Sequence, residues 1–434
     1  MNPRGLLVNV NKQQLSISYT PAGVPVIVEV LPHTRSVAAS ICVGTGSRDE
    51  GPSLNGISHF LEHMLFRGTT TRTYKEVNEA IEDAGGYLNA FTTHELTAYY
   101  CLTMDETSAT GLTLLEDIFI HPRMAKEHVD LERGVIKQEL NSMLNEPDIY
   151  IRRLMSRSHF GDHPLAWPVL GSEQTLDAFQ PEDLLRYHDD HYSPPNLAVV
   201  VAGNVRPDEI MVWAEASLDH LVPDGKARER TVPPVLHEVE VYPRNGEHTY
   251  VGLGLPGLAA PDERTAVQDV VCTILSGGAS SRFNHRIREE EGLVYSIHTN
   301  PVTYVDCGTV DTYFSTTSQR AERVLELFAE EIRKLKTDGL RPGELDRAKR
   351  VIKGAILRSL GQPRDDLRLM IFTFMGAGKV RTMDEIIRRV EAVTEEQIMA
   401  YVEQHLRRKK MCGAIHAAEE LARSVAAKAS EIDF

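Results

Sequence analysis

Three side chains that could bind a metal ion and use it lie within five residues of one another: His59, Glu62 and His63. In a helix, His59 and His63 stand one turn apart, so both imidazoles project from one face, which Glu62 shares. Two imidazoles at this spacing make half of a tetrahedral zinc site, and a neighbouring carboxylate can accept a proton from water held at the metal. The spacing favours a zinc site with its own base, although an ordinary amphipathic helix could carry the same residues.

Such a site needs a third protein ligand, and the predicted helix over residues 126–145 offers Glu139. A carboxylate ligand far along the chain is common in zinc peptidases, because it joins two helices through one metal. Glu132 lies two turns earlier on the same face of that helix. Judged by their own positions, both glutamates could equally be surface charges, since glutamate is common on exposed helices.

The elements that must position these residues follow from apolar periodicity. Before residue 222 we expect strands at 15–19, 24–30, 36–43, 87–93, 97–104 and 197–203, and helices at 55–67, 73–84, 107–120, 126–145 and 208–221. After residue 234 we expect strands at 248–255, 294–299 and 309–315, and helices at 265–275, 281–291, 318–336, 342–360 and 364–375. The order strand-then-helix of residues 98–119 recurs at 308–328, which indicates two similar α+β halves, the second without the histidine pair.

Residues 222–234 are rich in proline and charge and form the best candidate linker. We therefore expect an N-terminal metal-binding domain at 1–221 and a C-terminal domain of similar structure at 235–434.

The composition is that of an ordinary globular protein, with 42% hydrophobic and 25% charged residues in 434. A formal net charge of −15 argues against nucleic-acid binding and is compatible with attraction of cationic peptides. The first 14 residues lack the apolar run of a signal peptide, and no apolar stretch has membrane length. The five cysteines are scattered, without a C-x-x-C pair, so we expect reduced thiols, a cytoplasmic location and no membrane partner.

Several weaker patterns are set aside. The run Gly252-Leu-Gly254-Leu-Pro-Gly257 fits a dinucleotide fingerprint, but Pro256 and the residues after it do not begin a helix. Residues 376–379 lack the first glycine of a phosphate-binding loop, and the basic run 407–410 is short. Four histidines have no ligand-like spacing and are interpreted as surface or satisfied residues: His159, His163, His188 and His191.

Taken together, several blocks resemble the pitrilysin/insulinase family of zinc peptidases, whose metal motif is His-x-x-Glu-His, the inverzincin order. The resemblance is greatest to the short-chain branch that includes the mitochondrial processing peptidase subunits and their prokaryotic relatives. It rests on these segments, in order: His59-Phe-Leu-Glu-His-Met-Leu-Phe-Arg-Gly-Thr69, Asn89-Ala-Phe-Thr92, Tyr99-Tyr100, Glu132-Arg-x-Val-Ile-x-x-Glu139, Ser281-Arg-Phe283 and Arg288-Glu-x-x-Gly292-Leu-x-Tyr295. It implies an α+β fold of two similar halves, each a mainly antiparallel sheet covered by helices.

The resemblance also implies one zinc ion per chain, bound by His59, His63 and Glu139, with Glu62 as general base for peptide-bond hydrolysis. Glu132 corresponds to a position near the zinc ligands, and we expect it to support them.

Substrate-binding residues are implied in both halves. The strand carrying Asn89, Ala90 and Phe91 resembles an edge strand that takes an extended peptide as an added strand, although an ordinary core strand would show the same pattern. Arg288 and Tyr295 match a pair that reaches the active site from the second half. The tyrosine could stabilise a developing oxyanion, and the arginine could hold a carbonyl or carboxylate.

Both the zinc residues and the Arg288/Tyr295 pair occur in this one chain. We therefore expect an endopeptidase for short or unfolded peptides, acting in a chamber formed by two chains. The pairing would be a homodimer, or a heterodimer with a related chain. Two alternatives stay open: a scaffold or partner subunit that keeps the fold without catalysis, and an enzyme dedicated to one precursor.

Overall fold

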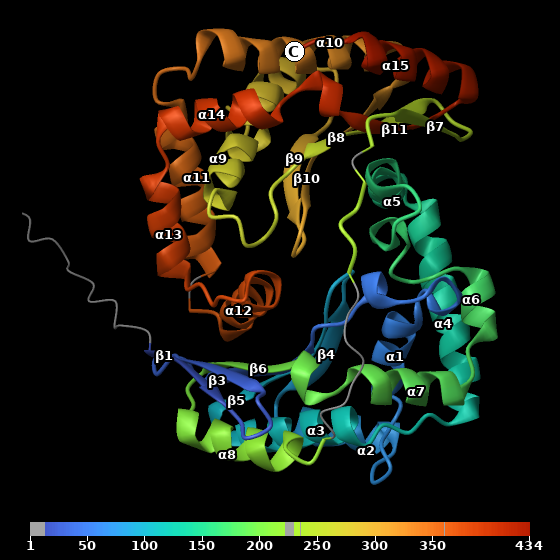
Figure 1. The fold of residues 1–434 in the computed structure, drawn as a ribbon, viewed down its shortest axis with the longest axis vertical. Coiled ribbons are helices and arrows are strands. Elements are labelled where there is room, and N and C mark those ends of the chain that lie inside the picture. The colour runs from blue at the N-terminus through green and yellow to red at the C-terminus, as the bar shows by residue number, and fades with distance from the viewer. Residues whose placement is uncertain (1–13, 222–229, 235, 360) are drawn as a thin grey trace, which may run out of the picture.

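A computed structural model describes residues 14–221, 230–234, 236–359 and 361–434. Within them the chain forms two β-sheets, each with helices on both faces (Figure 1). Part of the expected linker, residues 222–229, and position 235 lie outside the described residues, as do residues 1–13 and 360. None of the helices in the described ranges is long and apolar enough to cross a membrane.

The first sheet, sheet 1, has the strand order β1-β2-β6-β3-β5-β4. All its neighbouring strands are antiparallel except the pair β2 and β6. Its strands are β1 Gln14–Tyr19, β2 Pro25–Val30, β3 Ser36–Val43, β4 Tyr87–Thr92, β5 Thr97–Met104 and β6 Leu197–Gly203. The helices of this half are α1 Ile57–Leu65, α2 Tyr74–Asp83, α3 Ser108–Ile120, α4 Lys126–Asn145, α5 Pro147–Phe160, α6 Glu173–Ala178, α7 Pro181–His191 and α8 Pro207–Leu218.

The second sheet, sheet 2, has the order β7-β11-β8-β10-β9. Its strands are β7 Val239–Pro243, β8 His248–Pro256, β9 Ile297–Thr303, β10 Gly308–Thr317 and β11 Cys412–Ala417. Its helices are α9 Thr265–Ser276, the π-helical η6 Asn284–Glu290, α10 Ser318–Asp338, α11 Glu344–Ser359, α12 Pro363–Ala377, α13 Met383–Ala392, α14 Glu395–His405 and α15 Glu419–Glu431.

The two sheets share one topology. Apart from β1, each places its first and last strands side by side and parallel, and the others pair antiparallel in the same order. The prediction of two similar α+β halves, each with a mainly antiparallel sheet, is therefore confirmed.

Each half sends one helix to the sheet of the other half. Helix α5 belongs to the first half in sequence but packs on β8 and β11, whereas α12 belongs to the second half and packs on β3 and β6 (Figure 1). We call α5 and α12 the crossing helices. Their apolar side chains bury the sheet faces that the other helices leave uncovered: Leu367, Met370 and Ile371 from α12, and Ile151, Leu154 and Met155 from α5.

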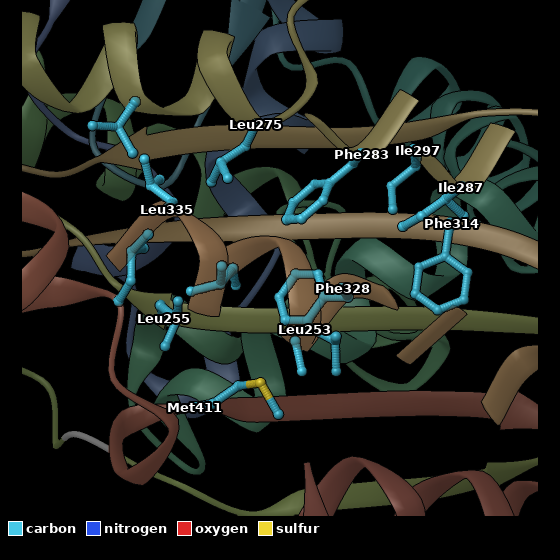
Figure 2. Close-up of a cluster of buried hydrophobic side chains, with 14 of the residues drawn as sticks. Leu253, Leu255, Leu275, Phe283, Ile287, Ile297, Phe314, Phe328, Leu335 and Met411 are labelled. Carbon is cyan, nitrogen blue, oxygen red and sulfur yellow. The ribbon is translucent and has the colours of Figure 1, made fainter. Parts of the chain in front are cut away.

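The opposite face of each sheet packs on the helices of its own half. In sheet 2 this is the larger core, where Leu253 and Phe314 from the strands meet Leu275 and Phe328 from α9 and α10 (Figure 2). Both faces of both sheets are thus buried, which explains why strands such as β6 read as continuous apolar runs.

Glycines on β8 let α5 approach sheet 2 closely. A Cβ atom at Gly252 would overlap Met155, and one at Gly254 would overlap the imidazole of His159. These glycines belong to the pattern that fits a dinucleotide fingerprint. The structure places them within a strand, where they make room for a helix and do not open a phosphate-binding turn.

Replacing Gly254 with alanine should therefore destabilise the protein by about 1–3 kcal/mol, because the added methyl group must displace His159 or shift α5. Thermal unfolding followed by circular dichroism measures the change. Gly278→Ala is the matched control, since no described atom lies within 4 Å of a Cβ there. Equal unfolding temperatures for the two variants would contradict the close approach.

The two crossing helices differ in the ionisable groups that they place against the sheets: α5 forms a pair of opposite charges, whereas α12 brings two carboxyl groups together. On α5, His159 Nε2 lies 2.6 Å from Asp311 Oδ1 of β10, and this carboxylate, despite the burial that opposes it, raises the pKa of His159 to about 10. On α12, Asp366 lies near Glu29 of β2. Burial, reinforced by the neighbouring carboxylate, raises the pKa of Glu29 to about 7, and burial raises that of Asp366 to about 6. No lysine or arginine of the described chain forms an ion pair with Glu29 or Asp366.

Stability should consequently depend on pH at the α12 contact. A carboxyl whose pKa is higher in the folded than in the unfolded chain loses its proton more easily when the chain unfolds. The free energy of unfolding therefore falls as pH rises from about 4 to about 7, through the pKa values of these two groups. Asp366→Asn should raise the free energy of unfolding at pH 8 by roughly 1–3 kcal/mol and by about a third of that amount at pH 4.5. Urea unfolding at both pH values measures this, with Asp346→Asn, at an exposed position in the first turn of α11, as control. A gain that is equal at both pH values would disprove the role of ionisation.

Some expectations about local structure need correction. The helix expected at 281–291 is π-helical over Asn284–Glu290, and the strand expected at 294–299 runs over Ile297–Thr303. Three of the four histidines set aside, His159, His188 and His191, are buried. His159 is hydrogen-bonded to Asp311 and His188 to a backbone carbonyl, so of the two expected alternatives they are the satisfied kind and not surface residues. The five cysteines are free thiols, and all except Cys307 are buried, as expected.

Candidate metal centre

Helix α1 carries the histidine pair, and specific contacts fix its start and its orientation. The carboxylate of Glu50 accepts hydrogen bonds from the backbone N–H groups of Gly56 (2.7 Å) and Ser58 (2.8 Å) at the helix start. Gly56 has a positive φ of 98° and lies against Gly171, so a side chain there would be strained and crowded. The apolar side chains Ile57, Phe60, Leu61, Met64 and Leu65 are fully buried, which turns the His59, Glu62 and His63 face toward α4 and β4.

The structure brings His59, His63 and Glu139 together. Their ligand atoms all lie within 4.8 Å of one another, and Glu139 Oε2 is 3.7 Å from Nε2 of each histidine. Ligand atoms bound to one tetrahedral zinc ion would lie about 3.4 Å apart, given bonds of about 2.0–2.1 Å. Two imidazole nitrogens and one carboxylate oxygen are also donors that zinc prefers. The donor set and its spacing therefore fit zinc.

Glu132 supports the cluster from behind His63. Its Oε2 lies 2.8 Å from His63 Nδ1, and its other oxygen pairs with Arg67. Burial lowers the pKa of His63, but the hydrogen bond with Glu132 and the negative charges of the surrounding carboxylates together outweigh it, so the net shift is upward. A proton held on Nδ1 leaves Nε2 with a free lone pair for the metal. Glu132 is not one of the three residues whose ligand atoms form the cluster, and it contacts the cluster through His63.

Glu62 lies on the same face as the two histidines. The hydroxyl of Thr92, at the end of β4, donates a 2.5 Å hydrogen bond to Glu62 Oε2. Burial raises the pKa of Glu62, whereas the Thr92 hydrogen bond opposes the shift. A carboxyl with a raised pKa can both accept and return a proton near neutral pH, as acid–base catalysis requires.

A cavity of about 510 Å³ opens beside the cluster. His59, Glu62 and Glu139 line it together with residues of β4, α5 and the segment 166–170. Its apolar surface includes Phe91 and Trp167, which suits peptide side chains.

Strand β4 is one of the two edge strands of sheet 1 and passes this cavity. Ala90 and Phe91 line the cavity, as expected for a substrate strand. Asn89 is exposed and does not line it; its amide oxygen accepts a 2.8 Å hydrogen bond from the backbone N–H of Ala90. Because β4 pairs with β5 alone, its other side is an open edge of the sheet.

Arg288 and Tyr295 are not brought to the cluster. They lie near each other, with the Arg288 guanidinium 5.9 Å from the centre of the Tyr295 ring, but neither lines the cavity. Tyr295 is 87% exposed. Their expected contact with the site therefore stays a prediction.

Sequence reasoning assigned no role to four neighbours of the site: Arg67, Thr92, and Arg152 and Arg153 of α5. Arg67 stands one turn after His63, so helical spacing could have indicated it. Thr92 lies in a block of the family resemblance, but its contact with Glu62 depends on the tertiary fold. The α5 arginines carry no local signal, because only the tertiary fold brings them to the cavity.

The fold and the cluster define a two-domain α+β protein built around an inverted zinc-peptidase motif. Two family models match the chain: "Insulinase (Peptidase family M16)" over residues 25–173 and "Peptidase M16 inactive domain" over residues 178–352. The chain belongs to the insulinase family, peptidase family M16, as the sequence blocks predicted.

Relatives and solved structures agree with this assignment. The chain is 34% identical to the "Uncharacterized zinc protease YmxG" of Bacillus subtilis (strain 168), covering 87% of this chain and 92% of the relative. It is 32% identical to the "Uncharacterized zinc protease SCO5738" of Streptomyces coelicolor, covering 91% and 88%. The crystal structure of a protease from Helicobacter pylori has a TM-score of 0.85 at 18% identity, covering 93% and 99%, and shows the same fold.

Proposed function

We propose that the protein is a zinc-dependent metalloendopeptidase that hydrolyses short or unfolded peptides. One observation carries this proposal: His59, His63 and Glu139 present three zinc-type donor atoms within 4.8 Å of one another, with Glu62 on the same helix face. The names of the relatives support zinc as the metal.

The roles of the protein groups follow from their positions. Zinc, when bound, supplies a Lewis acid that polarises the peptide carbonyl and activates a water molecule. Glu62 accepts the proton of the attacking water and returns it to the leaving amine. Thr92 fixes the orientation of Glu62, and Glu132 fixes the ring of His63. The outer edge of β4 offers backbone groups to an extended peptide, which requires little of the peptide's sequence.

The proposal includes one zinc ion per chain, a chamber formed by two identical chains, and a cytoplasmic location. A second chain would complete a chamber to which this chain contributes two domains. Free, mostly buried cysteines suit a reducing compartment.

Removing and restoring the metal tests the proposal. Dialysis against a chelator should abolish cleavage of an internally quenched peptide, and one equivalent of zinc per chain should restore it. A protein that binds no zinc and cleaves no peptide, with or without added metal, would instead be a scaffold or partner subunit of the same fold.

A further inference from the structure

One face of α5 forms a wall of the cavity beside the metal cluster. Ile149, Arg152, Arg153 and Ser156 all line the cavity, and their spacing of three, four and seven residues places them on one helix face. The wall therefore combines an apolar residue with two guanidinium groups, next to the proposed catalytic residues.

These arginines lack carboxylate partners. Arg153 is only partly exposed, yet no described side chain or carbonyl forms a hydrogen bond or ion pair with it. Arg152 stacks on the ring of Tyr313, 4.5 Å from its centre, and likewise has no described ion pair. Burial lowers the pKa of Arg153, and the charge of another arginine, Arg157, one turn further along α5, acts in the same direction.

The carboxylates of the cavity are already engaged. Glu139 belongs to the metal cluster, and Glu62 accepts the hydrogen bond of Thr92. A partly buried guanidinium without a counter-ion is costly in a folded protein, and it binds a carboxylate well through paired N–H donors. The protein as a whole carries a net charge of −15, so positively charged side chains without an acidic partner contrast with its overall negative charge.

We propose that the α5 wall binds a carboxylate of the peptide substrate, with Arg153 as the residue that recognises it. The inference deepens the proposed peptidase function and rests on it. The carboxylate is either an aspartate or glutamate side chain close to the cleaved bond or the C-terminal carboxylate of a short peptide. The negative net charge of the protein attracts cationic peptides over long range. Among the peptides that enter the cavity, the α5 wall then favours those that place one negative group beside α5.

Two peptide sets distinguish the two sources of the carboxylate. In the first, internally quenched peptides with blocked ends differ only by Asp or Asn at successive positions around the cleaved bond. In the second, one neutral peptide has a free or an amidated C-terminus. In at least one set the zinc-loaded protein should prefer the carboxylate by roughly tenfold in kcat/KM, as for a hydrogen bond between charged groups. Arg153→Gln should bring that ratio close to one, and high salt should reduce it.

Arg157→Gln is the matched control, because Arg157 lies on the same helix but lines a neighbouring cavity and not this one. It should keep the preference. A binding measurement separates this inference from the proposed function: labelled peptides of both sets are titrated into Glu62→Gln protein with and without Arg153→Gln. Arg153-dependent preference in binding supports the subsite even if no peptide is cleaved. Absence of such a preference from both cleavage and binding overturns it, whether or not the protein is a peptidase.

Discussion

Replacing Glu62 with glutamine should lower kcat/KM for peptide cleavage by roughly 10³-fold or more, with bound zinc unchanged. Glutamine has the same shape but cannot accept the proton of the attacking water, and Glu62 is not one of the three residues whose donor atoms form the cluster. Cleavage of an internally quenched peptide and metal analysis of the same sample measure both quantities.

The fold should survive this change, because the glutamine can still accept the hydrogen bond that Thr92 donates to Glu62. Glu79→Gln, at an exposed position of α2, is the matched control and should keep full activity. Unchanged turnover in Glu62→Gln would show that another group acts as the base.

Replacing Glu139 with alanine should remove zinc and activity together. Its carboxylate is the donor that joins α4 to the two histidines of α1, 3.7 Å from each. Without it only two protein ligands remain, so zinc affinity should fall by at least about 100-fold, more than for loss of a supporting residue. Dialysis followed by metal analysis measures the loss.

The folded state should tolerate the Glu139 change, since the side chain is 48% exposed and fills no core space. Gln138→Ala, one residue earlier on the exposed side of α4, should keep zinc and activity. Full zinc retention by Glu139→Ala would mean that a different third ligand completes the site.

Much of the metal centre could be predicted because helical spacing determines it. The positions of His59, Glu62 and His63 place their side chains on one face of any helix, and the apolar residues between them determine which face is buried. Glu139 and Glu132 were candidates from their positions on one helix, and the family resemblance assigned their roles. Their two-turn spacing explains why one meets the metal cluster while the other meets His63.

The arrangement between the halves could not be predicted. The apolar stripes of α5 and α12 would suit any sheet face, so nothing local shows that each crosses to the other half. The glycines of β8 did not indicate the crossing either. Gly252 and Gly254 fit a nucleotide motif that the following residues exclude, and only the three-dimensional packing shows that they accommodate Met155 and His159. The arginines of α5 reach the metal cavity through this same crossing, which is why they could not be found from spacing.

The exchange of α5 and α12 also affects how the chain is made. Sheet 1 is complete in the nascent chain once Gly203 has been synthesised, but the helix that covers its second face starts only at Pro363, 160 residues later (363 − 203). At a synthesis rate of about 5–20 residues per second, that face of the sheet lacks the helix that buries it for roughly ten seconds or longer. The ribosome-bound intermediate therefore exposes an apolar sheet surface, an expected binding site for a chaperone that acts during translation.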